Sequence, residues 1–180
     1  MNGFAPEDPE YIRQTEPEVY QGYLQSYQAL AKELGICLVP GTIVERHVPS
    51  PDQSGSESPQ SQPDSSDKSR KTAAAAAAVK VLYNTTYFIS PQGTILSSYR
   101  KKNIWHPERP YLTSSGVTDD PHVGFDTPIG KVGLLICWDV AFPEAFRELV
   151  RQGVEIIIVP TFCSFPFTPY NYVTVFCTVN

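Results

Sequence analysis

The sequence contains few of the residues that hold metal ions or cross-link small secreted domains. Its 180 residues include four cysteines, at positions 37, 137, 163 and 177, and no Cys-x-x-Cys pair. The three histidines, at positions 47, 106 and 122, lack the spacing of metal ligands. Disulfide scaffolds and zinc sites are recognised by closely spaced cysteines and histidines. We therefore expect no disulfide framework, no metal site and no cofactor.

The chain also lacks an excess of positive charge and a long apolar run. Its formal net charge is -5, and the basic run at residues 100–102 is too short to form a nucleic-acid surface. No apolar stretch is long enough to span a bilayer, and the N-terminus lacks the charged and then apolar pattern of a signal peptide. These absences exclude nucleic acid and membrane as expected partners, and the cytoplasm is the expected location.

The content of apolar residues predicts one globular domain. With 41% hydrophobic and 18% charged residues, the chain can build one sizeable core and hardly two, so residues 1–180 form a single domain. Residues 49–78 are rich in Ser, Pro, Asp and Gln and then in Ala, a composition that predicts a disordered low-complexity insertion. Residues 162–180 mix aromatics, prolines and threonines without a helical or strand period, and we expect an atypical tail there.

The remaining segments alternate between helical and strand patterns. Apolar residues recur at helical spacing over 20–34, before a glycine, and again over 143–152. Strand patterns occupy 36–44, with an interruption at Pro40 and Gly41, and 154–159. Two further strand patterns, 81–89 and 94–99, flank a turn and predict a hairpin. This alternation predicts an α/β fold.

One cysteine lies where a strand pattern meets a helix signal. Residues 131–144 read KVGLLICWDVAFPE, with apolar residues alternating before Cys137 and a helix start at Pro143. Cys137 therefore ends a strand, where free amides and the dipole of a following helix favour a thiolate. The alternative is a buried core cysteine, because free cysteine is among the most buried residues.

Three motifs resemble those of the nitrilase superfamily, the carbon-nitrogen hydrolases. The nucleophile motif is Cys137, Trp138 and Asp139, followed by Phe-Pro-Glu at residues 142–144. Upstream, the predicted hairpin ends in the lysine motif, and Lys101 aligns with the catalytic lysine. The segment PERPYL contains Glu108, which aligns with a second glutamate of the family.

The resemblance implies an incomplete nitrilase-like α-β-β-α sandwich and a hydrolase of non-peptide C–N bonds. In this family Cys137 would attack a small amide, nitrile or carbamoyl compound and form a thioester or thioimidate, which water then hydrolyses. Lys101 would stabilise the tetrahedral intermediate, supported by Glu108, while Trp138 and Asp139 would contact the substrate. The resemblance also implies a homodimer.

The sequence departs from the family at the proton-accepting glutamate. The family places this residue in a Pro-Glu pair before the stretch that residues 2–4 match, so we expect a chain truncated at both ends. Glu45 is a weak substitute, because it follows an apolar run. The glutamates nearer the N-terminus are expected to be solvated, and they lie at positions 7, 10, 16 and 18.

Two alternatives to an active hydrolase follow from the sequence. A missing general base costs about a hundredfold to ten-thousandfold in rate, so the chain could be an inactive fragment or a noncatalytic relative. A different cysteine hydrolase would pair Cys137 with His106 or His122. No glycine-flanked nucleophile elbow surrounds Cys137, which argues against this second alternative.

Overall fold

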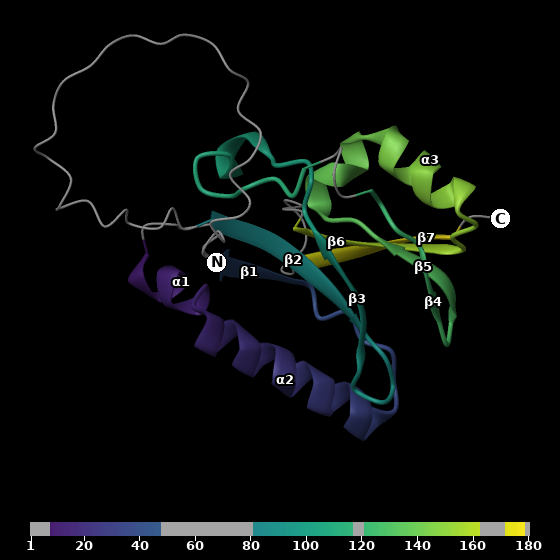
Figure 1. Ribbon diagram of the computed structural model, residues 1–180, viewed down its shortest axis with the longest axis horizontal. Helices are drawn as coiled ribbons and strands as arrows, with labels where there is room; N and C mark the ends of the chain where they lie inside the picture. Colours follow the sequence, from purple (N-terminus) through teal and green to yellow (C-terminus); the bar gives the residue numbers. More distant parts are fainter. Residues whose placement is uncertain (1–7, 48–80, 117–120, 163–171, 179–180) are drawn as a thin grey trace, which may run out of the picture.

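The computed structural model describes residues 8–47, 81–116, 121–161 and, for the backbone alone, 162 and 172–178. Two β-sheets lie between helices on their outer sides (Figure 1). The predicted insertion at 49–78 and the segment 163–171 lie outside the described residues. Within the described residues, no helix is both long and apolar enough to cross a membrane.

The first sheet is antiparallel, and two helices precede it in the sequence. Its strand order is β1-β2-β3, and α2 packs against β1 and β2. The predicted first helix is confirmed as α2, which Gly35 ends with a φ of 62°. The predicted hairpin is confirmed as β2 and β3. The elements are α1 (Pro9–Gln14), α2 (Pro17–Leu34), β1 (Thr42–His47), β2 (Val81–Ile89) and β3 (Ile95–Arg100).

The second sheet contains the strand that leads to Cys137. Its order is β4-β5-β6-β7, and β5 runs parallel to β6, so the predicted strand-helix-strand unit is confirmed. The short helix η2 lies between the two sheets in the sequence. The elements are η2 (His106–Glu108), β4 (Phe125–Thr127), β5 (Gly130–Leu134), η3 (Cys137–Ala141), α3 (Pro143–Arg151), β6 (Ile156–Phe162) and β7 (Tyr172–Thr178).

Within the segment 162–180, for which an atypical tail is expected, β7 pairs antiparallel with β6 along its whole length. The alternation of polar and apolar residues in this segment is weak. Backbone hydrogen bonds to the buried strand β6 nevertheless stabilise a strand that the side-chain pattern does not predict. The strand predicted over 36–44 is shorter in the structure. Only Leu38 forms a bridge with Ile89 before β1 begins at Thr42. The sequence patterns did not indicate the short elements α1 and β4.

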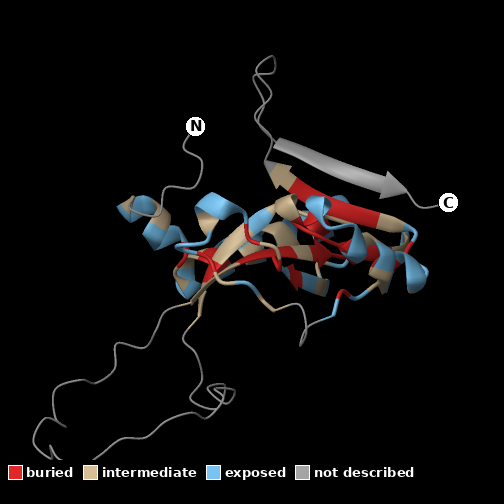
Figure 2. Cartoon of the chain, turned by 90° about the horizontal axis from the view of Figure 1, so that it is seen from above, coloured by how far each residue is buried: buried red, intermediate tan, exposed pale blue. Residues whose placement is uncertain are grey.

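The core lies between the sheets and beneath α3. Phe88 and Tyr99 from the first sheet join Val132 and Ile157 from the second, all of them buried. Leu149 of α3 covers the outer face of the second sheet and is fully buried. Figure 2 shows this pattern, with buried residues along the central strands and exposed residues on the helices. The strand before Cys137 is therefore held on both faces.

Gly133 of β5 allows α3 to lie close to the sheet. A Cβ atom built at Gly133 would come within 2.7 Å and 2.9 Å of the Leu149 methyl carbons. We expect Gly133→Ala to destabilise the protein by about 1 to 3 kcal/mol, because overpacking a well-filled core forces side chains from their rotamers. The free energy of unfolding in urea measures the effect.

The control for this substitution is Gly22→Ala on α2, where a Cβ meets no atom within 4 Å. We expect this change to stabilise the protein by about 0.5 to 1 kcal/mol, because alanine is the better helix former. Equal free energies of unfolding for the Gly133→Ala variant and the parent would contradict the close packing of α3 on β5.

Candidate active site

Cys137 lies at a sharp backbone turn directly after the buried end of the β5 segment. Ile136 is extended, with a φ of -133°, whereas Cys137 has a φ of 46°. Among the described residues, it is the one non-glycine residue with positive φ. Such a conformation costs free energy and persists where the surrounding structure enforces it, often at functional sites. The thiol is half-buried, so the side chain reaches the edge of the fold.

The helix start predicted at Pro143 is confirmed, but the sequence pattern did not indicate the turn between Cys137 and that helix. The chain forms the 3₁₀ turn η3 from Cys137 to Ala141, and α3 begins only at Pro143. The α3 dipole is thus separated from Cys137 by a full turn of chain. Local backbone geometry, more than α3, sets the environment of the thiol.

Asp139 fixes this turn. Its side chain is fully buried, and Oδ2 accepts hydrogen bonds from the Ile136 backbone N–H at 2.9 Å and from the Tyr99 hydroxyl at 2.9 Å. Oδ1 accepts from the backbone N–H of Asn103 at 3.0 Å and from its side-chain amide at 2.8 Å. A buried carboxylate is tolerated when its oxygens are paired in this way.

These bonds join two segments that are distant in sequence. Asn103 lies two residues after Lys101, whereas Asp139 lies two residues after Cys137. The Asp139 carboxylate therefore holds the lysine segment against the cysteine turn. The sequence predicted a substrate contact for Asp139, but its carboxylate faces protein donors.

Lys101 and Glu108 form a buried ion pair at the start of the loop after β3. The Lys101 side chain has 0% exposure, and its Nζ lies 2.6 Å from Glu108 Oε2. The same carboxylate oxygen accepts the Trp105 backbone N–H at 3.2 Å, which closes the η2 turn around Glu108. The backbone N–H of Lys101 donates to the Asn84 carbonyl at 2.8 Å. Both partners that the sequence singled out are thus brought together and oriented.

Trp138 and the two histidines near the site have other partners. The Trp138 ring packs edge to face against His106, with 6.0 Å between the ring centroids. His122 Nδ1 lies 2.7 Å from Glu148 Oε2, and its Nε2 lies 3.4 Å from the Tyr99 hydroxyl. Both ring nitrogens of His122 thus contact Tyr99 and Glu148, which argues against His122 as a base for Cys137.

Glu45 does not face the site. It pairs with Tyr83 across β1 and β2, on the face that carries α2, whereas Phe88 and Tyr99 face the other sheet. The Glu45 carboxylate accepts a hydrogen bond from Tyr87 and lies 2.9 Å from His47 Nε2. The suggested substitute base is therefore corrected, because strand alternation puts its side chain on the opposite face of the sheet.

The other acidic candidates near the N-terminus lie at the surface. Glu10 pairs with Arg13 within α1, and both side chains are more than half exposed. Glu16 pairs with Arg46 of β1. Glu18 is exposed, and Glu7 lies outside the described residues. In the part of the chain that the structure describes, no group of three or more Cys, His, Asp or Glu side chains could hold a metal ion.

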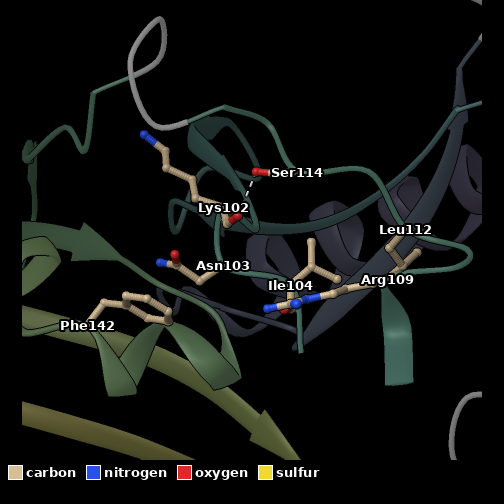
Figure 3. A pocket seen from close by; sticks show the side chains of 7 residues that line it. All are labelled: Lys102, Asn103, Ile104, Arg109, Leu112, Ser114 and Phe142. Atoms are coloured by element: carbon tan, nitrogen blue, oxygen red, sulfur yellow. Dashed lines mark hydrogen bonds between the residues drawn. The ribbon is translucent and has the colours of Figure 1, made fainter. Parts of the chain in front are cut away.

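A cavity of about 450 Å³ lies beside the loop that carries Lys101 and Glu108. Figure 3 shows the Lys102 and Arg109 side chains, which come from different parts of this loop, and the Phe142 ring across from them. Neither Cys137 nor the Lys101–Glu108 pair lines this cavity, so it flanks the candidate site and does not contain it. The lining residues are Lys102, Asn103, Ile104, Arg109, Leu112, Ser114 and Phe142.

Sequence reasoning missed the residues that bridge the motifs. Tyr99, Asn103 and Glu148 were not selected, and His122 was considered only as an alternative base, although Tyr99 ends a strand pattern on its core-facing side. A buried tyrosine hydroxyl nearly always finds a partner, and this was the one available signal. The identity of that partner depends on the packing of the two sheets, which the sequence pattern does not specify.

The comparison with known proteins agrees with these motifs. The family model of the carbon-nitrogen hydrolases matches residues 4–175. A probable nitrilase of Schizosaccharomyces pombe is 33% identical over 88 residues, which cover 49% of this chain and 31% of that protein. The deaminated glutathione amidase of Bos taurus is 28% identical over 164 residues, or 88% of this chain and 42% of that protein.

A solved structure shares the fold. The carbon-nitrogen hydrolase from Helicobacter pylori G27 superposes with a TM-score of 0.61 at 24% identity, over 88% of this chain and 43% of that one. This likeness confirms the predicted nitrilase-type α/β fold. The chain spans less than half the length of each of these relatives. Because the family model matches nearly the whole sequence, the protein belongs to the carbon-nitrogen hydrolase family, as its three motifs predicted.

Proposed function

We propose that this protein cleaves the C–N bond of a small amide, nitrile or carbamoyl compound, with Cys137 as the nucleophile. The observation that carries the proposal is the Asp139 carboxylate, which joins the Cys137 turn to the segment of Lys101. The names of the relatives support the substrate class, since one is an amidase and another a probable nitrilase.

For an amide, the Cys137 sulfur attacks the carbonyl carbon and forms a tetrahedral intermediate. The ammonium group of Lys101 stabilises the negative charge on its oxygen, and Glu108 holds that ammonium in place. The C–N bond then breaks, the nitrogen leaves as ammonia or an amine with the proton from the thiol, and water hydrolyses the thioester. Trp138, half-buried beside Cys137, is proposed to contact the substrate.

We assign Asp139 to a positioning role in place of the substrate contact that the sequence predicted. Four donors already occupy its two oxygens, and the side chain has 0% exposure. A substrate could reach this carboxylate only if one of those hydrogen bonds broke. Its effect on the reaction is therefore to hold the Cys137 turn in a fixed position relative to the Lys101 segment.

A noncatalytic relative is the second candidate. The observation that favours it is the position of Glu45, whose buried carboxylate faces α2 and is not placed to accept the proton of Cys137. The two candidates differ in a measurable way. A hydrolase turns over amides, whereas a noncatalytic relative with an assembled site reacts once with an electrophile and stops.

Cys137 is expected to be the preferred target of a small haloamide such as fluoroacetamide. The assembled site binds the amide group and presents a sulfur nucleophile, whereas partial burial raises the pKa of the Cys37 thiol. Peptide mass spectrometry identifies the alkylated cysteine and its rate of modification. Cys137→Ala removes the label, and Cys37→Ala is the matched control that keeps it. Equal labelling of the Cys137→Ala variant and the parent would refute the nucleophile assignment.

Replacement of Lys101 tests the role of the ammonium group. We expect Lys101→Ala to lower kcat for short amides by about a hundredfold to a thousandfold, because removal of one oxyanion-stabilising donor has an effect of this size. Ammonia release from a panel of short amides and nitriles measures it. Lys32→Ala, at an exposed position on α2, is the matched control. A Lys101→Ala variant with the parental kcat would show that the lysine has no part in catalysis.

Asp139→Asn tests the positioning role. An asparagine side chain offers one acceptor oxygen in place of two, so at least one buried donor loses its partner. We expect a loss of about 1 to 3 kcal/mol in the free energy of unfolding and a slower alkylation of Cys137. Asp126→Asn, an exposed residue of β4, is the matched control for urea unfolding. Parental stability and alkylation in the Asp139→Asn variant would rule out the assigned role.

A further inference from the structure

A second set of buried polar side chains lies behind the candidate site. His122 is 5% exposed, and its two ring nitrogens face Glu148 of α3 at 2.7 Å and the Tyr99 hydroxyl of β3 at 3.4 Å. The Tyr99 hydroxyl in turn donates to Asp139 Oδ2 at 2.9 Å. These four residues form a continuous chain of contacts from α3 to the Cys137 turn, which we call the Glu148–Asp139 chain.

The order of donors in this chain is constrained. Tyr99 has one hydroxyl proton, which it gives to Asp139, so its oxygen can only accept from His122. The two rings also stack, with 5.8 Å between centroids and 25° between planes. The ring stacking fixes the direction of the hydroxyl, and the Glu148 carboxylate fixes the orientation of the imidazole.

The backbone around His122 is anchored to the same helix. The Gln152 side-chain amide donates to the His122 carbonyl at 2.7 Å and accepts the Gly124 N–H at 2.9 Å. Gln152 caps the C-terminal end of α3, and Glu148 lies one turn before it. Two side chains of α3 therefore hold His122, and a shift of that helix would reach Asp139 through Tyr99.

We propose that His122, Tyr99 and Glu148 are positioning residues for the reaction at Cys137, which they support through Asp139. This inference rests on the proposed function, and none of the three side chains needs to touch the substrate. Asp139 holds both the Ile136 N–H and the Asn103 amide, so a displaced Tyr99 would shift the cysteine turn relative to Lys101.

The chain contains a matched control for this idea. Tyr87, on the same sheet, donates its hydroxyl to the buried carboxylate of Glu45, as Tyr99 does to Asp139. It lies on the face that α2 covers, away from the Cys137 turn. Both tyrosines therefore donate a hydrogen bond to a buried carboxylate, and Tyr99 is the one that faces the Cys137 turn.

The test compares Tyr99→Phe with Tyr87→Phe in the full chain. We expect Tyr99→Phe to slow the alkylation of Cys137 by iodoacetamide roughly tenfold, because small displacements of reacting groups have large effects on rate. Tyr87→Phe should change this rate less than about twofold. It should lower the unfolding midpoint in urea by about as much as Tyr99→Phe does, because both variants lose a hydrogen bond to a buried carboxylate. For amide hydrolysis, the Tyr99→Phe variant should lose kcat while KM stays within about twofold.

Four further variants keep the test decisive if Tyr99→Phe fails to fold. The Glu148 side chain is 41% exposed, so Glu148→Gln should fold, and it should slow alkylation several-fold. Glu33→Gln, at an exposed position on α2, is the matched control and should not slow it. His122→Gln keeps a donor and an acceptor and should retain more of the alkylation rate than His122→Leu.

Equal alkylation rates in the Tyr99→Phe and Tyr87→Phe variants would overturn the inference, as would equal rates in the Glu148→Gln and Glu33→Gln variants. Failure of the proposed function looks different. In that case the parent protein is alkylated at Cys137 but releases no ammonia from any amide or nitrile. The ratio of the alkylation rates of the Tyr99→Phe and Tyr87→Phe variants still decides whether the Glu148–Asp139 chain positions the thiol.

Discussion

The carboxylate of Asp139 is the interaction on which the rest of the site depends. Each of its oxygens accepts two hydrogen bonds, and the donors come from the strand before Cys137, from β3 and from the loop after β3. A charge in a protein interior is strongly unfavourable unless such donors surround it. The first sheet and the segment after β5 are thereby joined by directional hydrogen bonds that link the Cys137 turn to the Lys101 segment.

The buried Lys101–Glu108 pair depends on the same arrangement. Ion pairs in a protein interior contribute little net stability, because the desolvation of both charges offsets their attraction. The Lys101 side chain has no exposure to solvent, so its charge would be costly without Glu108. An ammonium group kept in this setting acts strongly on any charge that develops nearby, since little water screens it.

The sequence predicted the order of the principal elements and the three motifs, because these depend on local spacing. The start of α3 at Pro143 and the end of α2 at Gly35 follow from turn and capping preferences. Partners across the fold were not predictable. The role of Asp139 and the orientation of Glu45 depend on which face of a strand meets which sheet, and β7 depends on hydrogen bonds to β6.

The positive φ of Cys137 has an evolutionary consequence. Glycine adopts this backbone conformation with little strain, whereas a residue with a Cβ does so at a cost. Selection for folding stability alone would therefore replace the thiol at this turn. A cysteine retained at this position would require selection for the chemistry of sulfur. The protein would tolerate the backbone strain because the packing of neighbouring residues provides a margin of stability.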